Sequence, residues 1–205
     1  EQSLESFLNL FDKNLVKKVK LLQKKDDKIH KFQELATQFK RSDKIIQDLD
    51  QAAQMYQDGY YPLAISIVEN LCNQYPQRVS LWNTLGYYQQ RNKEFKKSIK
   101  SFKRALDLDS NFIHTLNNKG LSLLFLHEIE ESKIYFDKAK KIDATESFVL
   151  RNMGIYYSAT TELEKAKSYF EKSIAINSST ELVYFYYAIA LFQNNENDKA
   201  IIQLR

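Results

Sequence analysis

The residues Trp-Asn-Thr-Leu-Gly at positions 82–86 decide the fold, because the glycine that ends this stretch recurs at a fixed interval. Gly86, Gly120 and Gly154 are 34 residues apart, and two further columns of similar residues follow the same interval. Internal repetition of this length is typical of helical arrays. The first small column is Ala52, Gly86, Gly120, Gly154 and Ala188, the second is Ala64, Ser98, Ser132, Ala166 and Ala200, and the large column is Val68, Phe102, Phe136, Phe170 and Leu204.

These columns predict pairs of closely packed helices. A small residue near the middle of a first helix lets a second helix approach, the second small column faces it, and the large column fills the space beside them. Apolar residues between the columns recur at helical spacing, as in Trp82, Leu85 and Tyr88. Each repeat is therefore expected to be two antiparallel helices joined by a short turn, with Gly86, Gly120 and Gly154 in helical conformation at the contacts.

One family shares this pattern. The chain resembles the tetratricopeptide repeat family, whose pattern of tryptophan, leucine-glycine, aromatic, alanine, phenylalanine and alanine is matched by Trp82, Leu85-Gly86, Phe95, Ser98, Phe102 and Ala105. The resemblance implies an all-α, right-handed superhelical solenoid of antiparallel helix hairpins with an N-terminal helical segment. Its units would be 45–78, 79–112, 113–146, 147–180 and an incomplete 181–205. The residues that depart from the pattern are Asp48, Ser110, Ala144, Ser173 and Ser178.

Residues 1–44 form a different segment, whose apolar residues follow three- and four-residue steps from Leu4 to Phe39. This spacing predicts one long amphipathic helix or two shorter ones. Its apolar stripe could cap the first repeat, or it could form a coiled coil with a second chain, since Leu8, Leu15 and Leu22 recur every seven residues. The second arrangement would make the chain a homo-oligomer.

Composition and motifs exclude several classes of protein. The three histidines, His30, His114 and His127, are isolated, so no metal site is expected. The glycines are too far apart for a phosphate-binding loop, and no nucleophile motif appears, so we expect neither a cofactor nor enzymatic activity. No stretch is apolar enough to insert into a membrane. Cys72 is expected to be a small buried residue, and a single cysteine favours the cytoplasm without identifying a compartment.

Nucleic acid is also not expected as a partner. The chain carries a formal net charge of +4, but its lysines alternate with carboxylates along the helical pattern instead of forming a block. Trp82 and the pairs Tyr87-Tyr88, Tyr156-Tyr157 and Tyr186-Tyr187 could stack on bases, yet the repeat places tryptophan in its own core, and one tyrosine of each pair should point inward.

The resemblance implies that first helices line a concave groove in which a protein or peptide binds. Asparagines at the fifth and sixth positions of the units look like the ladder by which some family members hold peptide backbones, although asparagine is also simply tolerated on a polar helix face. No unit carries the lysine and asparagine pair that binds chaperone C-termini in this family. The expected groove residues are Asn83, Tyr87, Arg91, Asn117, Asn118, Phe125, Phe148, Arg151 and Asn152.

The last unit is the most apolar part of the chain. Residues 182–192 are apolar on nearly all sides, so this helix is expected to be buried on both. Further repeats could cover it, or a partner or second copy could dock there. Two functions follow: an adaptor that holds a peptide in its groove, or an architectural subunit held by its N-terminal segment and its C-terminal unit.

Overall fold

The computed structural model describes residues 44–179 and 181–204. The chain divides into two compact units, residues 1–48 and 49–205, and the description below concerns the second. Both interpretations of the leader, as a cap and as a coiled coil, lie outside the described residues. None of the described helices is long and apolar enough to cross a membrane.

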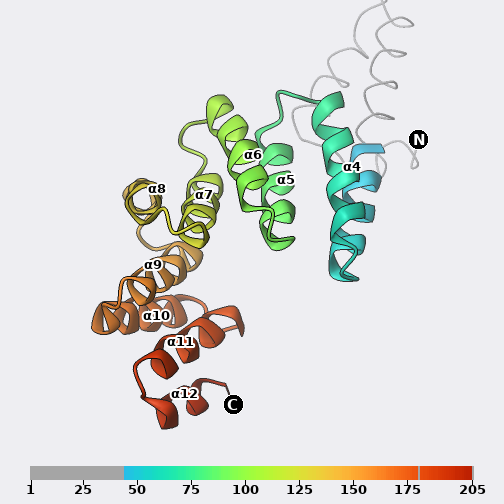
Figure 1. The fold of residues 1–205 in the computed structure, drawn as a ribbon. Coiled ribbons are helices and arrows are strands. Elements are labelled where there is room, and N and C mark those ends of the chain that lie inside the picture. Colours follow the sequence, from blue (N-terminus) through green and yellow to red (C-terminus); the bar gives the residue numbers. More distant parts are fainter. Residues whose placement is uncertain (1–43, 180, 205) are drawn as a thin grey trace, which may run out of the picture. The chain divides into compact units, whose positions relative to one another are not determined.

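The described residues form helices joined by short turns and contain no strand, which confirms an all-α solenoid (Figure 1). Each helix packs mainly on its neighbours in sequence, and α5, α7, α9 and α11, the first helices of successive hairpins, also contact one another in turn. The helices are residues 44–57, α4 (Tyr61–Gln74), α5 (Val79–Arg91), α6 (Phe95–Leu108), α7 (Ile113–Phe125), α8 (Ile129–Ile142), α9 (Ser147–Ala159), α10 (Leu163–Ile176), α11 (Glu181–Gln193) and α12 (Asn197–Gln203).

A glycine and a phenylalanine sixteen residues later hold each central hairpin together. A Cβ atom on Gly120 would lie 2.8 Å from Cε1 of Phe136, which is closer than packed carbon atoms approach. The same contact would be 2.5 Å between Gly86 and Phe102 and 2.6 Å between Gly154 and Phe170. The three phenylalanines are fully buried. The predicted close contact is confirmed, and the large column lies directly on the glycine.

The turn inside each hairpin repeats as regularly as the packing. Gly59 has a φ of +83°, and four residues at the equivalent position of the later units also have positive φ. In each, the N–H of this residue and that of the next donate to carbonyls of the preceding helix, as in Lys93 to Gln90 and Glu94 to Gln89. This is the Schellman arrangement that ends helices. The four residues are Lys93 (62°), His127 (62°), Thr161 (62°) and Asn195 (61°).

Aromatic and sulfur side chains occupy the expected core. One tyrosine of each pair is buried, and these are Tyr88, Tyr156 and Tyr187. Trp82 is partly buried and donates from Nε1 to the carbonyl of Pro76 at 2.9 Å, which ties α5 to the turn before it. Cys72 is buried on α4, and burial raises the pKa of its thiol to about 12. A thiol protonated at neutral pH is a poor nucleophile, so Cys72 acts as a packing residue.

Candidate functional site

Side chains from distant hairpins come together on one side of the first helices. Arg91 at the end of α5 and Arg151 near the start of α9 lie close enough for the charge of one to lower the pKa of the other. Tyr56, from the helix of residues 44–57, and Tyr186, on α11, lie in the same electrostatic environment. These side chains therefore belong to the side of the array that its first helices form. We call this side, over α5, α7, α9 and α11, the inner face.

Two of the expected asparagines are joined on the inner face. Oδ1 of Asn83 accepts a hydrogen bond from Oγ1 of Thr115 at 3.0 Å and a longer one from Nδ2 of Asn118 at 3.5 Å. Gln90 connects the same helices by donating to the carbonyl of Asn118 at 2.8 Å. Asn83 and Asn118 are both partly exposed. They therefore form a polar bridge between α5 and α7 that a ligand can reach.

The other two asparagines lie below the surface. Asn117 is 1% exposed and Asn152 is completely buried. Among the described residues, neither amide atom of Asn117 has a hydrogen-bond partner, and Nδ2 of Asn152 has none either. Oδ1 of Asn152 accepts a hydrogen bond from Nε of Arg151 at 3.0 Å. These two asparagines therefore do not continue the open row that starts with Asn83 and Asn118.

The expected cations of the inner face are brought together. Burial lowers the pKa of Arg151, and the charge of Arg91 lowers it further. Burial also opposes the charge on Arg91, but Tyr56 and Tyr87 outweigh this effect and its pKa is raised. Arginine stays protonated at neutral pH in either case. Within the part of the chain that the structure describes, neither arginine forms a salt bridge.

Tyr87 belongs to this cluster and not to an apolar pocket. Its hydroxyl lies 3.0 Å from that of Tyr56, whose ring also stacks on Tyr88 at a centroid distance of 4.7 Å. Burial, followed by the hydrogen bond to Tyr87, raises the pKa of Tyr56. Its hydroxyl is therefore neutral at physiological pH and offers no negative charge to Arg91. Counting positions along the first unit would have identified Tyr56 as a member of the inner face.

The two expected phenylalanines do not share a pocket. Phe125 ends α7 and packs on Phe95 at a centroid distance of 5.1 Å, whereas Phe148 near the start of α9 stacks on His114 at 4.7 Å. Neighbouring first helices run in the same direction, so these rings lie near opposite ends of the inner face. Phe125 is 38% exposed and Phe148 is partly buried.

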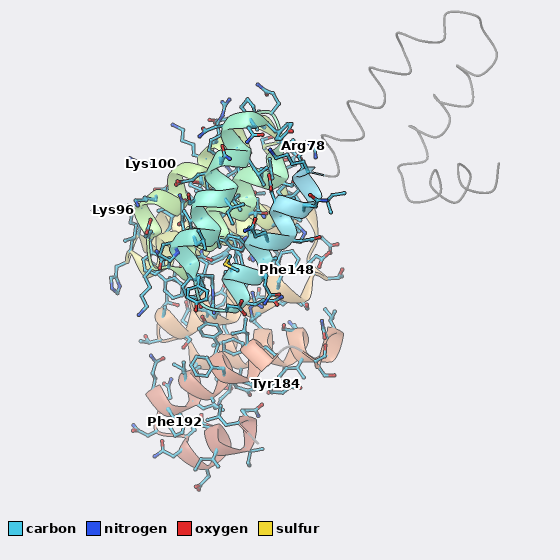
Figure 2. All side chains as sticks on the ribbon, turned by 90° about the vertical axis from the view of Figure 1, so that its right-hand side faces the viewer. Arg78, Lys96, Lys100, Phe148, Tyr184 and Phe192 are labelled. Carbon is cyan, nitrogen blue, oxygen red and sulfur yellow. The ribbon has the colours of Figure 1, made fainter. Side chains whose placement is uncertain are left out.

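Within the described residues, α11 of the C-terminal unit is buried on one side and exposed on the other, which leaves apolar side chains for the further repeats or partner expected to cover residues 182–192. Val183, Tyr187 and Leu191 are buried, but Phe185 is 51% exposed and Phe192 43%. Figure 2 shows Phe192 and Tyr184 on α11, and Tyr184 is the more buried of the two because it packs against the core. Phe185 stands at the same position of its unit as Arg151 does in the unit before. It therefore extends the inner face with an apolar side chain.

A second concavity, not expected from the sequence, lies between α4, α5 and α6. It has a volume of about 320 Å³ and is lined by Trp82, Cys72, Lys97 and Lys100 among others. Its polar walls are paired with each other, since Ser101 donates to Gln89 at 2.7 Å and Gln89 donates to Glu69 at 3.4 Å. In the described residues no group of His, Cys, Asp and Glu could hold a metal ion.

Comparison with known proteins gives the same class of fold. The family model of the tetratricopeptide repeat matches residues 79–112, 113–146 and 152–180. These three segments are therefore tetratricopeptide repeats, which form protein-interaction modules. No curated protein matches it in sequence.

Solved structures agree in fold at low sequence identity. A thermophilic tetratricopeptide repeat protein from Thermus thermophilus, TTC0263, is 15% identical, with a TM-score of 0.71 over 77% of this chain and 86% of that one. PilF of Pseudomonas aeruginosa is 22% identical, with a TM-score of 0.63 over 80% and 76%. MamA of Desulfovibrio magneticus RS-1 is 12% identical, with a TM-score of 0.58 over 78% and 91%. These similarities concern the fold alone.

Proposed function

We propose that the inner face binds an extended segment of a partner protein. The observation that carries the proposal is the set of polar and charged side chains that four successive first helices turn to one side, with two arginines that no carboxylate of the described residues neutralises. Asn83 and Asn118 offer amide donors and acceptors, which an extended peptide backbone requires. The fold itself is typical of non-enzymatic proteins.

The test begins with affinity capture of a partner from native extract, followed by titration of that partner against variants. The double variant Asn83→Ala and Asn118→Ala removes the accessible amides of the inner face. A net contribution of about 0.5–1.5 kcal/mol for each hydrogen bond predicts roughly a tenfold loss of affinity for the pair.

A matched control distinguishes the inner face from a general loss of amides. Asn73 and Asn111 are exposed asparagines outside the inner face. Their double alanine variant should bind the partner as the unmodified protein does. Equal affinity for the Asn83 and Asn118 variant would remove the support for peptide binding at this face.

A second function is favoured by the exposed apolar side chains of the C-terminal unit. Ile202 is 64% exposed and Leu204 55% on or beside α12, and Phe185 is 51% exposed on α11. In this alternative the chain is an architectural subunit of an assembly and docks a neighbouring protein here. Serine at Ile202 and Leu204 would then abolish capture of the partner, while the double variant of Asn83 and Asn118 would leave capture unchanged.

A further inference from the structure

The second helix of the second hairpin, α6, concentrates positive charge on one side. Five of its residues are basic, and all five are exposed. At 3.6 residues per turn they fall within an arc of about 120° around the helix axis. Figure 2 shows two of them, Lys96 and Lys100, at the edge of the array. We call this side the basic stripe, and its residues are Lys96, Lys97, Lys100, Lys103 and Arg104.

The repeat does not require these charges. The equivalent positions hold three carboxylates and one lysine in α8, and two carboxylates and two lysines in α10. Lys96 and Lys97 lie in the first turn of α6, where the helix dipole disfavours cations, whereas α8 and α10 have glutamates there. Lys100 is three or four residues from each of the other four cations, a spacing at which like charges destabilise a helix. The stripe therefore makes α6 less stable, and the repeat itself gives no reason for it.

The carboxylates around the basic stripe neutralise little of it. Glu94 pairs with Lys97 at 2.7 Å, and Glu69 on α4 acts on the same lysine from farther away. Asp107, the acidic residue of α6 itself, is exposed. Within the described residues no carboxylate forms a salt bridge with the other four cations. The stripe therefore presents a net positive charge to a ligand.

The basic stripe borders the cavity of about 320 Å³ between α4, α5 and α6. Lys97 and Lys100 belong to both, and Trp82 and Leu85 give the cavity apolar walls. The polar groups in its walls are bonded to one another, as described above. An apolar or aromatic side chain can therefore enter without leaving a polar group unpaired.

The next hairpin shows which kind of side chain fits this cavity. Ser101, in the cavity wall, stands at the position that Tyr135 holds in α8. The hydroxyl of Tyr135 accepts a hydrogen bond from Nζ of Lys119 at 2.6 Å, and this lysine lies 4.2 Å from the centre of the ring. Lys119 is the equivalent of Leu85, which lines the cavity. The ring of Tyr135 therefore lies where the second hairpin is open.

The hairpin after that repeats the arrangement with Tyr169, again at the position of the serine. Its ring stacks on Tyr157 at a centroid distance of 5.3 Å, and its hydroxyl accepts a hydrogen bond from Nζ of Lys140 at 2.8 Å. Tyr157 and Lys140 are the equivalents of Gln89 and Cys72, which both line the cavity. The cavity is therefore the place of one tyrosine ring, and it is open because the second hairpin has serine there.

From this arrangement we infer that the basic stripe and the cavity bind an acidic segment of a partner protein that carries a tyrosine. The ring fills the cavity, and the neighbouring carboxylates pair with the stripe. A cavity that matches a tyrosine ring in two other hairpins favours a protein segment over a nucleic acid or a lipid surface. This surface is separate from the residues of the inner face and does not depend on the proposed function.

The length of the stripe sets the spacing in the partner segment. From Lys96 to Arg104 the helix rises about 12 Å, which an extended chain covers in about four residues. Lys97 and Lys100 line the cavity as well, so the ring and the carboxylates must be close in sequence. The segment should therefore carry acidic residues directly beside its tyrosine.

A designed peptide tests this inference without knowledge of the natural partner. The probe is the acetylated and amidated peptide Gly-Glu-Asp-Tyr-Glu-Asp-Gly, which is titrated into the complete chain by calorimetry at low ionic strength. One reference peptide replaces the four acidic residues by their amides, and the other replaces tyrosine by alanine. We expect saturable binding of the probe and roughly tenfold weaker binding of each reference peptide.

Charge variants of the protein separate the basic stripe from general attraction. The double variant Lys100→Gln and Arg104→Gln should weaken binding of the probe about fivefold. The matched control is Lys138→Gln and Lys172→Gln, which removes the same charge from exposed positions of α8 and α10 that are equivalent to Arg104. It should leave affinity within about twofold of the unmodified protein. The stripe variant should also melt no lower than the unmodified protein, because it removes a repulsion within α6.

A third variant fills the cavity with the residue of the later hairpins. Ser101→Tyr should fold, since α8 and α10 accommodate a tyrosine at this position, and thermal unfolding checks that it does. With the cavity filled from within, the variant should bind the probe and its alanine form with equal affinity. It should still prefer both of them to the amide peptide, because the basic stripe is unchanged.

Each contrary result has a defined meaning. Equal binding of the probe and its amide form, no binding of either up to millimolar concentration, or an equal loss in the control of α8 and α10 would overturn the role of the stripe. A folded Ser101→Tyr variant that still prefers the tyrosine peptide would overturn the assignment of the cavity. Tighter binding of a uridine oligonucleotide than of the probe would overturn the protein partner. None of these outcomes involves Asn83 or Asn118, so the proposed function stands or fails separately.

Discussion

The interior of the hairpins and their inner face obey different rules. Inside the hairpins, the close approach of phenylalanine to glycine recurs in three units with nearly the same geometry, so that a Cβ atom on the glycine would lie 2.5 to 2.8 Å from the ring. On the inner face, equivalent positions hold different groups, as in Asn117, Arg151 and Phe185. Packing between identical hairpins requires the same small and large residues each time, whereas a ligand surface has no such requirement. The residue types that repeat every 34 residues therefore specify the fold, whereas the residue types that differ between equivalent positions of the inner face determine which ligand it can bind.

Leucine at Gly120 should disrupt the periodic part most strongly. Its Cβ atom alone would come within 2.8 Å of the buried ring of Phe136, and the larger side chain would force the two helices apart. Overpacking of this kind predicts a loss of about 3 kcal/mol in the free energy of unfolding, measured by urea denaturation.

A second variant shows whether this contact is the cause. Gly120→Ala combined with Phe136→Leu should lose less stability than the sum of the two single variants, since a smaller side chain makes room for the new methyl group. Additive losses would contradict the direct contact.

Replacing Asn117 by leucine should raise the free energy of unfolding, in contrast to leucine at Gly120. The Asn117 amide is buried and has no hydrogen-bond partner in the part of the chain that the structure describes, and an unsatisfied buried polar group costs about 1–3 kcal/mol. An apolar side chain of similar size should therefore stabilise the protein by about 1 kcal/mol or more. The control is Asn118→Leu, which replaces a partly exposed amide that bonds Asn83. A stability gain at both positions, or at neither, would show that burial of Asn117 is not the reason.

The hairpins were predictable from the sequence because close packing leaves a mark on residue type. Glycine at 86, 120 and 154 and phenylalanine sixteen residues later fixed the register of every helix pair. The sequence did not predict that each ring lies directly on its glycine, since a column of large residues is equally compatible with a position beside it. The turns were harder still, because only one of the five equivalent turn residues, Gly59, is a glycine, and Lys93 and Thr161 are residue types that rarely adopt a positive φ.

The candidate site was predictable only as a set of positions. Counting within a unit identified Arg91 and Arg151, but their proximity depends on the curvature that accumulates over two repeats. Burial of Asn117 and Asn152 depends in the same way on neighbouring hairpins, and the exposure of one side of α11 depends on them too. Sequence patterns report which side of a helix is polar. They do not report how far apart two such sides lie in a curved array.

Replacing Thr161 by glycine would give its turn the same residue type that Gly59 provides in the first unit. A β-branched residue with a φ of 62° is strained, and the left-handed conformation costs roughly 1 kcal/mol that glycine avoids. The variant should therefore be more stable by about 1 kcal/mol in thermal or urea unfolding. Asn195→Gly is the control, because asparagine already tolerates this conformation and should gain less. An equal gain at both turns would show that the residue type at the turn is unimportant.

The smallest expected change in stability concerns Lys133 and Lys167, which occupy the same position in two successive units. Lys167 on α10 pairs with Glu196 at the start of α12, whereas Lys133, at the equivalent position of α8, pairs with Asp137 in its own helix. The hydrogen bond from Lys167, followed by that from Lys199, lowers the pKa of Glu196 below 4.5, and Glu196 in turn raises the pKa of Lys167 above 10.5. A carboxyl group whose pKa is lower in the folded state stabilises the fold at every pH above its unfolded-state pKa, and this contribution is lost as the pH falls through the folded-state pKa. A lysine whose pKa is higher in the folded state stabilises the fold at every pH below its unfolded-state pKa of 10.5, and this contribution is lost as the pH rises through the folded-state pKa. The variant Lys167→Met should therefore melt slightly below the unmodified protein between about pH 5 and 10, and the difference should shrink at pH 3.

Lys133→Met should show a smaller difference, because its exposed pair connects no second hairpin. A difference for Lys167→Met that persists unchanged at pH 3 would assign it to lost packing of the lysine stem and not to the ion pair.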